Sequence, residues 1–311
     1  MASSRNNPAD HIAVAGYKVA SMLARVAPSK LLEGASVGVG SSLARAMKQN
    51  RAMVMRHLQR VDPSLNGNRL QEATQQAFVS YTRYYLETFR LPSLSTSQIA
   101  AGHQVEGFEH IERAASHGKG TILALPHMGG WEWSGRWLID QGFQLTAVVE
   151  RLENTDLFEW FVNLRSRYGV NVIALTDDAG VAVGKALRDN HVVSLLCDRD
   201  IPKDGKRTGV EVQFFGETTT VPAGPAFFAL RTGASLLPMA TFFTPGASGH
   251  KAVIRPALIV ERQGSLREDV LRISQLLMFE IENLIRQAPE QWHLFQPNWP
   301  SDPGYQELTV A

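Results

Sequence analysis

The sequence predicts an α/β fold, a mostly parallel central sheet flanked by helices, with an N-terminal helical region. Up to about residue 100 the apolar residues recur at helical spacing, and after that short Val, Ile and Leu runs alternate with amphipathic segments. Such alternation is typical of βαβ units, whose parallel strands are covered on both faces. With 44% hydrophobic and 20% charged residues, the composition is that of a folded globular protein.

The individual elements follow from local patterns. Three N-terminal helices are predicted at 10–27, 40–60 and 69–89, the last ending near Pro92. Central strands are predicted at the aliphatic runs 121–125, 145–149, 171–175 and 192–197, with helices between them at 131–140, 155–168 and 179–189. Further strands are expected at 211–215, 235–243 and 251–260. A closing helix opens with the capping box Ser265-x-x-Glu268 and stops before Pro289.

The first sixty residues carry nine basic side chains against Asp10 and Glu33, a local net charge of +7 in a chain whose net charge is +1. An apolar stripe at helical spacing accompanies this charge, with Lys18 and Arg25 off the stripe; its residues are Ile12, Ala15, Val19, Met22, Leu23 and Val26. This pattern predicts an amphipathic helix in the headgroup layer of an anionic membrane surface. The alternative is a helix that packs on its own domain and leaves a solvated basic face. Nucleic acid is not an expected partner, because no recognisable binding motif or aromatic platform accompanies the charge.

We therefore expect a single domain overall, in which residues 1–60 form a basic amphipathic membrane-association region and residues 61–311 form the α/β core. No uninterrupted apolar stretch reaches the roughly 18 residues that a spanning helix needs, and no signal-peptide pattern is present. The single cysteine, Cys197, ends an aliphatic run and is expected to be a buried strand residue in a reducing compartment. These features predict a protein that stays where it is made and does not span a membrane.

The segment 121–135 carries the strongest chemical pattern. His127 follows an apolar strand, two glycines come next, and Glu132 opens a helix. Reactive groups collect at the carboxyl ends of parallel strands, and a carboxylate five residues on can fold back to fix the imidazole tautomer. The amides of Gly129 and Gly130 could face a developing oxyanion, so the segment favours acyl transfer. The alternative is that His127 only closes a turn, although none of the eight other histidines has a comparable setting.

A second polar cluster, Asp198, Arg199 and Asp200, follows the strand 192–197 directly. Charges at this edge of the sheet could orient an acceptor or the phosphates of a donor, and the alternative is a solvated loop with a local ion pair. Glu150 and Arg165 are similar, weaker candidates.

Other chemistries lack their motifs. There is no Gly-x-Ser-x-Gly elbow for a serine hydrolase, and aliphatic neighbours would raise the pKa of a catalytic Cys197. There is no His-Glu-x-x-His, no paired Cys-x-x-Cys and no phosphate loop, so neither a metal nor an NTP is expected.

The pattern His-x-x-x-x-Glu after an apolar strand resembles the signature of the glycerolipid and lipid A acyltransferases, in which His is the base and the acid its partner. Further segments look like the lipid A late-acyltransferase branch and occur in its order. They are 150–154 with Arg165-x-x-x-Gly169, then 196–200, 214–218, 221–225, Thr232-Gly233-Ala234-x-x-x-Pro238 and Pro289-Glu290-Gln291-Trp292. The similarity covers most of residues 45–300.

Three departures from the lipid A enzymes are informative. Those enzymes have an N-terminal transmembrane anchor, an Asn where Gly130 stands, and a basic pair after the position of Trp292, where this chain has His293-Leu294-Phe295-Gln296. The combination is similar to that of the actinobacterial phosphatidylinositol mannoside acyltransferases, a branch with an amphipathic N-terminus.

The resemblance implies acyl-CoA, typically palmitoyl-CoA, as co-substrate with no further cofactor, and a mannose hydroxyl of a phosphatidylinositol mannoside glycolipid as acceptor. It also implies a peripheral membrane protein on the cytoplasmic face of the inner (plasma) membrane. It implies that His127 is the base and Glu132 its partner, with Glu150, Arg165, Asp198, Arg199 and Asp200 as substrate-binding candidates. Direct transfer without an acyl-enzyme is expected.

Several alternatives stay open at this point. The same histidine could use water and make an acyl-CoA thioesterase, the acceptor could be another glycolipid or a lysophospholipid, or the chain could bind lipid without catalysis. An acyl tunnel is expected near Phe227-Phe228 and Leu236-Leu237, although such residues are more often simple core.

Overall fold

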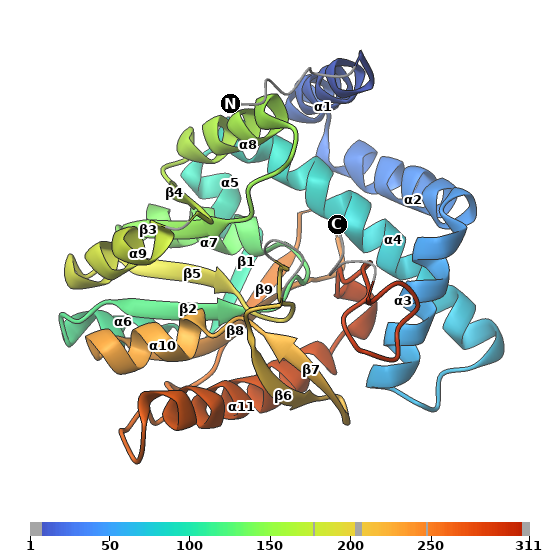
Figure 1. Ribbon diagram of the computed structural model, residues 1–311. Helices are drawn as coiled ribbons and strands as arrows, with labels where there is room; N and C mark the ends of the chain where they lie inside the picture. The colour runs from blue at the N-terminus through green and yellow to red at the C-terminus, as the bar shows by residue number, and fades with distance from the viewer. Residues whose placement is uncertain (1–7, 177, 203–206, 247, 307–311) are drawn as a thin grey trace.

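The computed structural model describes residues 8–176, 178–202, 207–246 and 248–306. At its centre is a seven-stranded sheet with the strand order β1-β9-β8-β2-β5-β3-β4 (Figure 1). Each neighbouring pair is parallel except β8 with β9, which is antiparallel. The mostly parallel sheet flanked by helices that the sequence predicts is therefore confirmed.

Helices dominate the first hundred residues. They are α1 (Pro8–Val26), α2 (Ser29–Ala46), α3 (Lys48–Val61), α4 (Gly67–Arg90), the short 3₁₀ helix η1 (Leu91–Ser93) and α5 (Thr96–Ala101). The long helices α2, α3 and α4 lie on the side to which strands β2 and β5 point, so their side chains can reach the carboxyl ends of those strands (Figure 1).

The rest of the chain alternates strands and helices. In order these are β1 (His103–Glu106), α6 (Phe108–Ser116), β2 (Thr121–Leu125), α7 (Trp131–Asp140), β3 (Leu145–Val149), α8 (Thr155–Ser166), β4 (Asn171–Ala174), α9 (Ala179–Arg188), β5 (Val192–Leu196), β6 (Val210–Phe214), β7 (Glu217–Val221), α10 (Gly224–Thr232), β8 (Ser235–Phe243), β9 (His250–Ile254), α11 (Leu266–Ile285) and the 3₁₀ helix η2 (Pro289–Gln291).

Strand β2 is buried along its whole length because both faces of the sheet are covered. Its alternate side chains enter different cores: Ile122 and Ala124 pack with residues of α9, α10 and α11. Leu123 and Leu125 pack on the other face, with residues of α6 and α7. Period-two alternation thus places α7, which follows His127, against one face of the central strands.

The structure also corrects several predicted boundaries. The helix predicted at 40–60 is two helices, which meet at Met47, where φ is −91° and ψ is 69°. The strand predicted at 251–260 ends at Ile254, and Arg255 is followed by Pro256, which has no amide hydrogen to extend a ladder. The strand predicted near 211–215 is half of a hairpin, β6-β7, whose two turn residues Phe215 and Gly216 both have positive φ.

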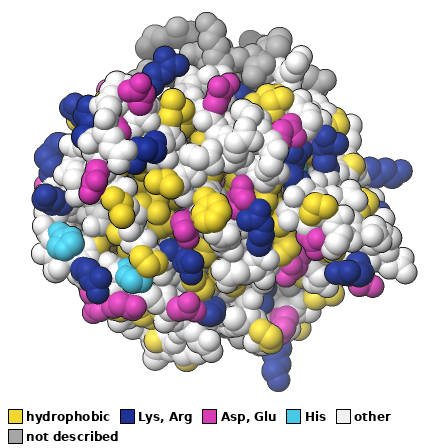
Figure 2. All heavy atoms as spheres, turned by 90° about the horizontal axis from the view of Figure 1, so that it is seen from below, with side chains coloured by type: hydrophobic (Ala, Val, Ile, Leu, Met, Phe, Trp, Pro, Cys, Tyr) yellow, Lys and Arg dark blue, Asp and Glu magenta, His cyan; other side chains and the backbone are white. Residues whose placement is uncertain are grey.

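Charges of both signs are mixed over the surface of the core. On the face seen from below, Lys and Arg side chains alternate with Asp and Glu side chains around hydrophobic ones (Figure 2). Within the ranges given above, none of the helices is long and apolar enough to cross a membrane.

Candidate active site

His127 lies in the turn between β2 and α7, at the carboxyl end of a central strand, as the sequence predicts. Gly129 makes this turn possible, because its φ is +55° and a Cβ there would lie 1.9 Å from the carbonyl oxygen of Thr241 in β8. No side chain fits that space, so the glycine allows the turn to pack directly on the neighbouring strand.

The last residue of η2 and the segment that follows it form hydrogen bonds with the same turn. The amide of His293 donates to the carbonyl oxygen of His127 at 2.7 Å, and the amide of Gly129 donates to the carbonyl oxygen of Gln291 at 3.0 Å. The prediction that both glycine amides face an oxyanion is therefore wrong for Gly129, whose hydrogen is already used. Gly130 is the remaining candidate of the pair.

Asp198, at the end of β5, is the carboxylate that contacts His127. Nδ1 of His127 lies 2.6 Å from Oδ1 of Asp198, and the His127 amide donates to Oδ2 at 3.0 Å. The two residues are 71 positions apart, and they meet because β2 and β5 are neighbouring parallel strands. A carboxylate on Nδ1 favours the tautomer with its hydrogen there, which leaves Nε2 as a hydrogen-bond acceptor and base.

Asp198 is fully buried, and two residues near the C-terminus fix it. Nε1 of Trp292 donates to Oδ2 at 2.7 Å, and Nδ2 of Asn298 donates to the Asp198 carbonyl oxygen at 3.1 Å. Burial alone would raise the pKa of the Asp198 carboxyl, but the charge of His127 and hydrogen bonds from His127 and Trp292 outweigh burial, so the pKa is lowered. The group is therefore an anion beside the imidazole.

Glu132 makes a different set of contacts from those that the sequence predicts. Its Oε1 accepts from Nε and Nη2 of Arg165 at 2.9 and 2.6 Å, and its Oε2 accepts from the Tyr168 hydroxyl at 2.7 Å. The Tyr84 hydroxyl donates to Oε1 at 3.3 Å. The expectation that Glu132 folds back to fix the His127 tautomer is corrected, because α7 directs this side chain toward α4 and α8 while Asp198 occupies Nδ1.

In this buried cluster Arg165 stays charged and the two tyrosines stay neutral. Burial alone would lower the pKa of Arg165, but the negative charge of Glu132, its hydrogen bond and the neighbouring Tyr84 and Tyr168 together outweigh burial and hold that pKa above its usual range. Burial, together with the same carboxylate, raises the pKa of Tyr84 and Tyr168 well above the ordinary value of 10.0. Both hydroxyls therefore stay protonated and donate to Glu132.

The remaining predicted residues separate into two groups. Nη2 of Arg199 lies 2.6 Å from Oε2 of Glu150, and both side chains are partly exposed. Asp200 is buried, and its carboxylate accepts the amide hydrogen of Gly209 at 3.1 Å. Arg199 and Glu150 are thus accessible to a ligand, whereas the contact of Asp200 is structural.

Three aromatic residues near His127 were not singled out from the sequence as site residues. The ring of Trp131 meets His127 edge-on, with 5.9 Å between ring centroids. Trp292 holds Asp198, and His293 is buried beside Trp131 and Tyr84 with Nε2 2.8 Å from Oγ of Ser80. Burial and the charge of His127 lower the pKa of His293 to about 3, so its ring is neutral. The motif Pro289-Glu290-Gln291-Trp292 was the sequence signal that could have identified Trp292. Its position along the chain did not show that Trp292 contacts Asp198, the residue near the end of β5.

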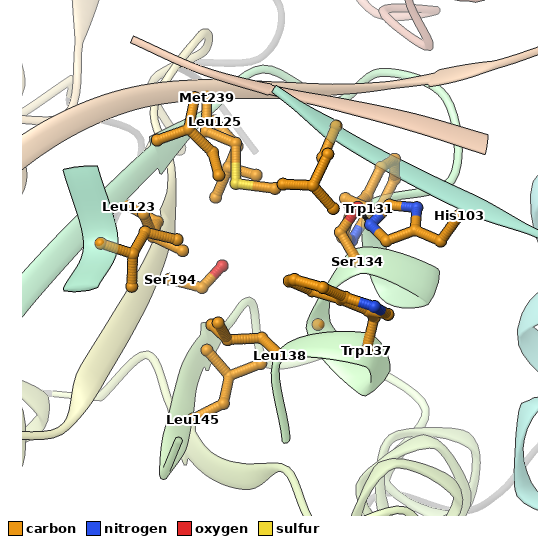
Figure 3. A pocket seen from close by; sticks show the side chains of 15 residues that line it. His103, Leu123, Leu125, Trp131, Ser134, Trp137, Leu138, Leu145, Ser194 and Met239 are labelled. Atoms are coloured by element: carbon orange, nitrogen blue, oxygen red, sulfur yellow. Dashed lines mark hydrogen bonds between the residues drawn. The ribbon is translucent and has the colours of Figure 1, made fainter. Parts of the chain in front are cut away.

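A small apolar cavity of about 30 Å³ lies between the sheet and helices α6 and α7. Trp131 lines it (Figure 3), and the ring of Trp131 also meets that of His127, which is not itself among the lining residues. Its walls come from α7 and from strands that include β2, β3 and β8, and the segments first expected to form a tunnel do not line it. Leu236 and Leu237 belong to the cores, and Phe227 is 37% exposed.

Within the described ranges, no group of three or more His, Cys, Asp or Glu side chains could hold a metal ion. Cys197 is buried and unpaired, and burial raises the pKa of its thiol well above the usual 9.0.

The chain is similar to several known acyltransferases. The family described as bacterial lipid A biosynthesis acyltransferase matches residues 4–301. A phosphatidylinositol mannoside acyltransferase of Mycobacterium tuberculosis is 37% identical over 228 residues, which cover 72% of this chain and 69% of the relative. A protein of the same name from Mycolicibacterium smegmatis is 32% identical over 92% of this chain and 91% of its own. A lipid A biosynthesis acyltransferase of Haemophilus influenzae is 23% identical over 87% of this chain and 82% of its own.

Proposed function

This chain belongs to the family of bacterial lipid A biosynthesis acyltransferases, and from that premise we propose that it transfers a palmitoyl-type chain from acyl-CoA to a mannose hydroxyl of a phosphatidylinositol mannoside. The names of the mycobacterial relatives support this acceptor. The observation that carries the mechanism is the contact between His127 and Asp198 at the carboxyl ends of β2 and β5.

His127 acts as general base in this proposal. Its Nε2 takes the proton of the acceptor hydroxyl while the hydroxyl oxygen attacks the thioester carbonyl carbon. The imidazolium that forms carries its positive charge next to Asp198, whose buried carboxylate stabilises it. Asp198 thus has the role of partner that the sequence suggested for Glu132.

The second step breaks the carbon–sulfur bond. The tetrahedral intermediate collapses to the new ester, and CoA leaves as a thiolate that can accept the proton held by His127. The amide of Gly130 is the candidate donor to the oxyanion. No residue of the chain becomes acylated, and a covalent acyl adduct trapped on the protein during turnover would contradict this sequence of steps.

The other predicted residues have supporting roles. Glu132 positions Arg165, because that buried guanidinium is held by both of its hydrogen bonds to one carboxylate oxygen. Arg199 and Glu150 are partly exposed and are the candidates to contact the sugar acceptor or the phosphates of CoA.

The N-terminal helices are proposed to dock on an anionic membrane surface. Four side chains of the predicted apolar stripe, Val19, Met22, Leu23 and Val26, are between 55% and 81% exposed, while Val14 and Ala24 of the same helix are buried. These four side chains do not pack on the domain, and Leu31 in α2 is exposed as well. Arg25 is turned toward the protein, where its Nε donates to the Phe89 carbonyl oxygen at 3.3 Å. Lys18 and Lys30 are better placed for lipid headgroups.

The decisive experiment measures release of free CoA from palmitoyl-CoA, with and without phosphatidylinositol mannoside, for the wild type and for His127→Ala. Release that needs the glycolipid and disappears in the variant is the expected result. Release that the glycolipid does not divert into acylated product would instead indicate a thioesterase. A signal unaffected by His127→Ala would remove the histidine from the mechanism and favour a lipid-binding protein without catalysis.

A lysophospholipid and an unrelated glycolipid serve as alternative acceptors in the same assay. Transfer to either at a rate equal to that with the phosphatidylinositol mannoside would overturn the acceptor assignment while leaving the acyltransferase class in place.

A further inference from the structure

We propose that Asp302 is a positioning residue for Asp198, on which it acts through Asn298 and not by direct contact. The inference rests on the proposed function, because it takes His127 to be a base that works beside Asp198. Asp302 comes after the last motif that the sequence analysis singles out, 289–292, so it adds a residue to the site that no local pattern suggested.

The carboxylate of Asp302 closes the turn that carries Asn298. Asp302 is 4% exposed, and its Oδ2 accepts the amide hydrogens of Asn298 at 2.8 Å and of Trp299 at 2.9 Å. The Asp302 amide in turn donates to the Trp299 carbonyl oxygen at 2.8 Å. Hydrogen bonds from two successive amides to one buried carboxylate oxygen fix this stretch of backbone, so the direction of the Asn298 side chain depends on Asp302.

Asn298 connects that turn to the site. It is buried, and its Nδ2 donates to the carbonyl oxygen of Asp198 at 3.1 Å. This bond reaches the backbone of Asp198, while the carboxylate of the same residue contacts His127 and Trp292. Asn298 therefore fixes where the Asp198 backbone lies, and Asp302 fixes where Asn298 lies.

Helix α3 supplies the side chains that hold Asp302 in place. Nε of Arg56 donates to Oδ1 at 2.8 Å, and Nη2 of Arg60 donates to the same oxygen at 3.4 Å. Nε2 of His57 lies 3.2 Å from Oδ2, and Nδ1 of the same ring lies 3.0 Å from the Leu294 carbonyl oxygen. His57 thus links the two stretches of the C-terminal segment that reach the site.

These contacts keep Asp302 ionised. Burial alone would raise the pKa of its carboxyl, but hydrogen bonds from His57 and from the amides of Asn298 and Trp299, together with the charge of His57, outweigh burial and hold the pKa well below its usual range. The group is an anion, and an anion accepts stronger hydrogen bonds from amides than a neutral carboxyl does.

Two basic side chains of the predicted membrane-association region therefore have a partner inside the protein. Arg60 also pairs with Glu217, its side chain is only 11% exposed, and its guanidinium carbon lies 4.1 Å from the ring centroid of Trp299. Arg56 is more exposed but is bound to Asp302 in the same way. This part of the basic N-terminal charge serves the C-terminal turn.

The test measures kcat and KM for CoA release, with palmitoyl-CoA and phosphatidylinositol mannoside, as a function of pH. In Asp302→Asn we expect kcat to fall about tenfold to a hundredfold while KM for palmitoyl-CoA stays within about twofold, because a displaced base slows the reaction without changing donor contacts. The acidic limb of the kcat profile should move to lower pH by about half a unit, because a less firmly placed Asp198 stabilises the imidazolium of His127 less. His293, another titratable group whose charge would act on His127, stays neutral.

Asp269→Asn is the matched control. Asp269 is 1% exposed, and its carboxylate accepts hydrogen bonds from the amides of Gln263 and Gly264 and from the side chains of Arg262 and Arg272, so the variant changes the same kinds of contact. It lies at the start of α11, on the opposite side of the molecule from α3 (Figure 1). This variant should lower stability without changing kcat or the pH profile.

Asn298→Ala tests the same route without changing Asp302. It removes the hydrogen bond to Asp198 and leaves the carboxylate of Asp302 with its amides and with α3, so it remains informative if Asp302→Asn folds poorly. We expect a loss of kcat and a shift of the acidic limb in the same direction as in Asp302→Asn. The double variant should lose no more kcat than the larger of the two single losses, because both changes act through one hydrogen bond.

Three results would overturn the inference. They are losses of kcat that multiply in the double variant, an acidic limb that does not move in either single variant, and a profile of Asp269→Asn that matches that of Asp302→Asn. Failure of the proposed function is recognised separately, because His127→Ala would then release CoA as the wild type does.

Discussion

At the scale of single residues, the site depends on which carboxylate touches the imidazole. Glu132 is close in sequence, but its two oxygens are occupied by Arg165 and by the hydroxyls of two tyrosines. Asp198 is distant in sequence and lies 2.6 Å from Nδ1 of His127. Proximity along the chain suggested Glu132 as the partner of His127, but the order of the strands brings Asp198 to that position.

Asp198→Asn tests this assignment. We expect kcat to fall by about 10² to 10⁴, because an amide neither fixes the correct tautomer as well nor stabilises the imidazolium. The comparison is Asp200→Asn, whose carboxylate holds the Gly209 amide, and which should lower stability with a much smaller loss of kcat. Equal losses of kcat in the two variants would contradict the assignment.

Two buried histidines should make stability depend on pH. Burial, with a smaller effect of neighbouring charge, lowers the pKa of His103 and of His293 to about 3 from the ordinary 6.5. As pH falls below 6.5, the unfolded chain binds protons that the folded chain does not, so the free energy of unfolding falls down to about pH 3.

His103→Gln should remove one of these protons. Between pH 7 and about pH 5, the variant should lose less unfolding free energy than the wild type, by up to about 2 kcal/mol in urea titrations. The exposed His117 provides the control substitution His117→Gln. Parallel pH profiles for the wild type and His103→Gln would contradict the lowered pKa, because they would show that His103 binds a proton equally well in the folded and the unfolded chain.

At the scale of elements, Glu132 joins three helices. It projects from α7 and contacts Arg165 of α8 and Tyr84 of α4. Because α7 also begins next to His127 and lines the cavity, this contact fixes the helix that carries both features. The role follows from packing and not from a contact with the imidazole.

Glu132→Gln should therefore lower the free energy of unfolding by about 3 kcal/mol, because the buried Arg165 charge loses its counterion. The double variant Glu132→Gln with Arg165→Met should recover part of that loss, since it removes the unpaired charge. Urea unfolding of both variants measures the effect. Unchanged stability together with a loss of kcat as large as in His127→Ala would make Glu132 a direct partner of the base.

The elements that the sequence predicts best are those buried on both faces. Strands β2 and β5 are continuous aliphatic runs, and their bounds agree with prediction to within a residue. Strand β1 was missed because His103–Glu106 is a short edge strand whose residues alternate between partly buried and exposed, without an apolar run. The break at Met47 was missed because apolar spacing continues through it.

At the scale of the whole molecule, the site joins parts of the chain that local patterns treat separately. The sequence points to the segments that follow β2 and β5, because residue type and strand ends are local information. It does not reveal that β2 and β5 are neighbours, or that Trp292 and Asn298 return to Asp198. The division into a membrane-association region, 1–60, and a core, 61–311, stays a prediction.

The exposed N-terminal stripe makes a further prediction. Replacing Met22 and Leu23 with Glu should weaken binding to anionic liposomes about tenfold or more, because it removes apolar area that would enter the headgroup layer. Co-sedimentation with anionic and zwitterionic vesicles measures this. Val181→Glu, at a similarly exposed position of α9, is the control and should bind as the wild type does. Undiminished binding of the double variant would remove α1 from the contact.

The hydrogen bonds from Trp292 and Asn298 to Asp198 also set an order of events during synthesis. Trp292 is translated 94 residues after Asp198, so at ribosomal rates of about 5 to 20 residues per second it follows by roughly 5 to 20 s. During that interval a nascent chain can already contain the β2 and β5 segments, but not the indole that fixes the carboxylate. A nascent chain whose Trp292 and Asn298 have not yet left the ribosome should therefore be inert toward acyl donors, and activity begins only once these two residues have reached Asp198.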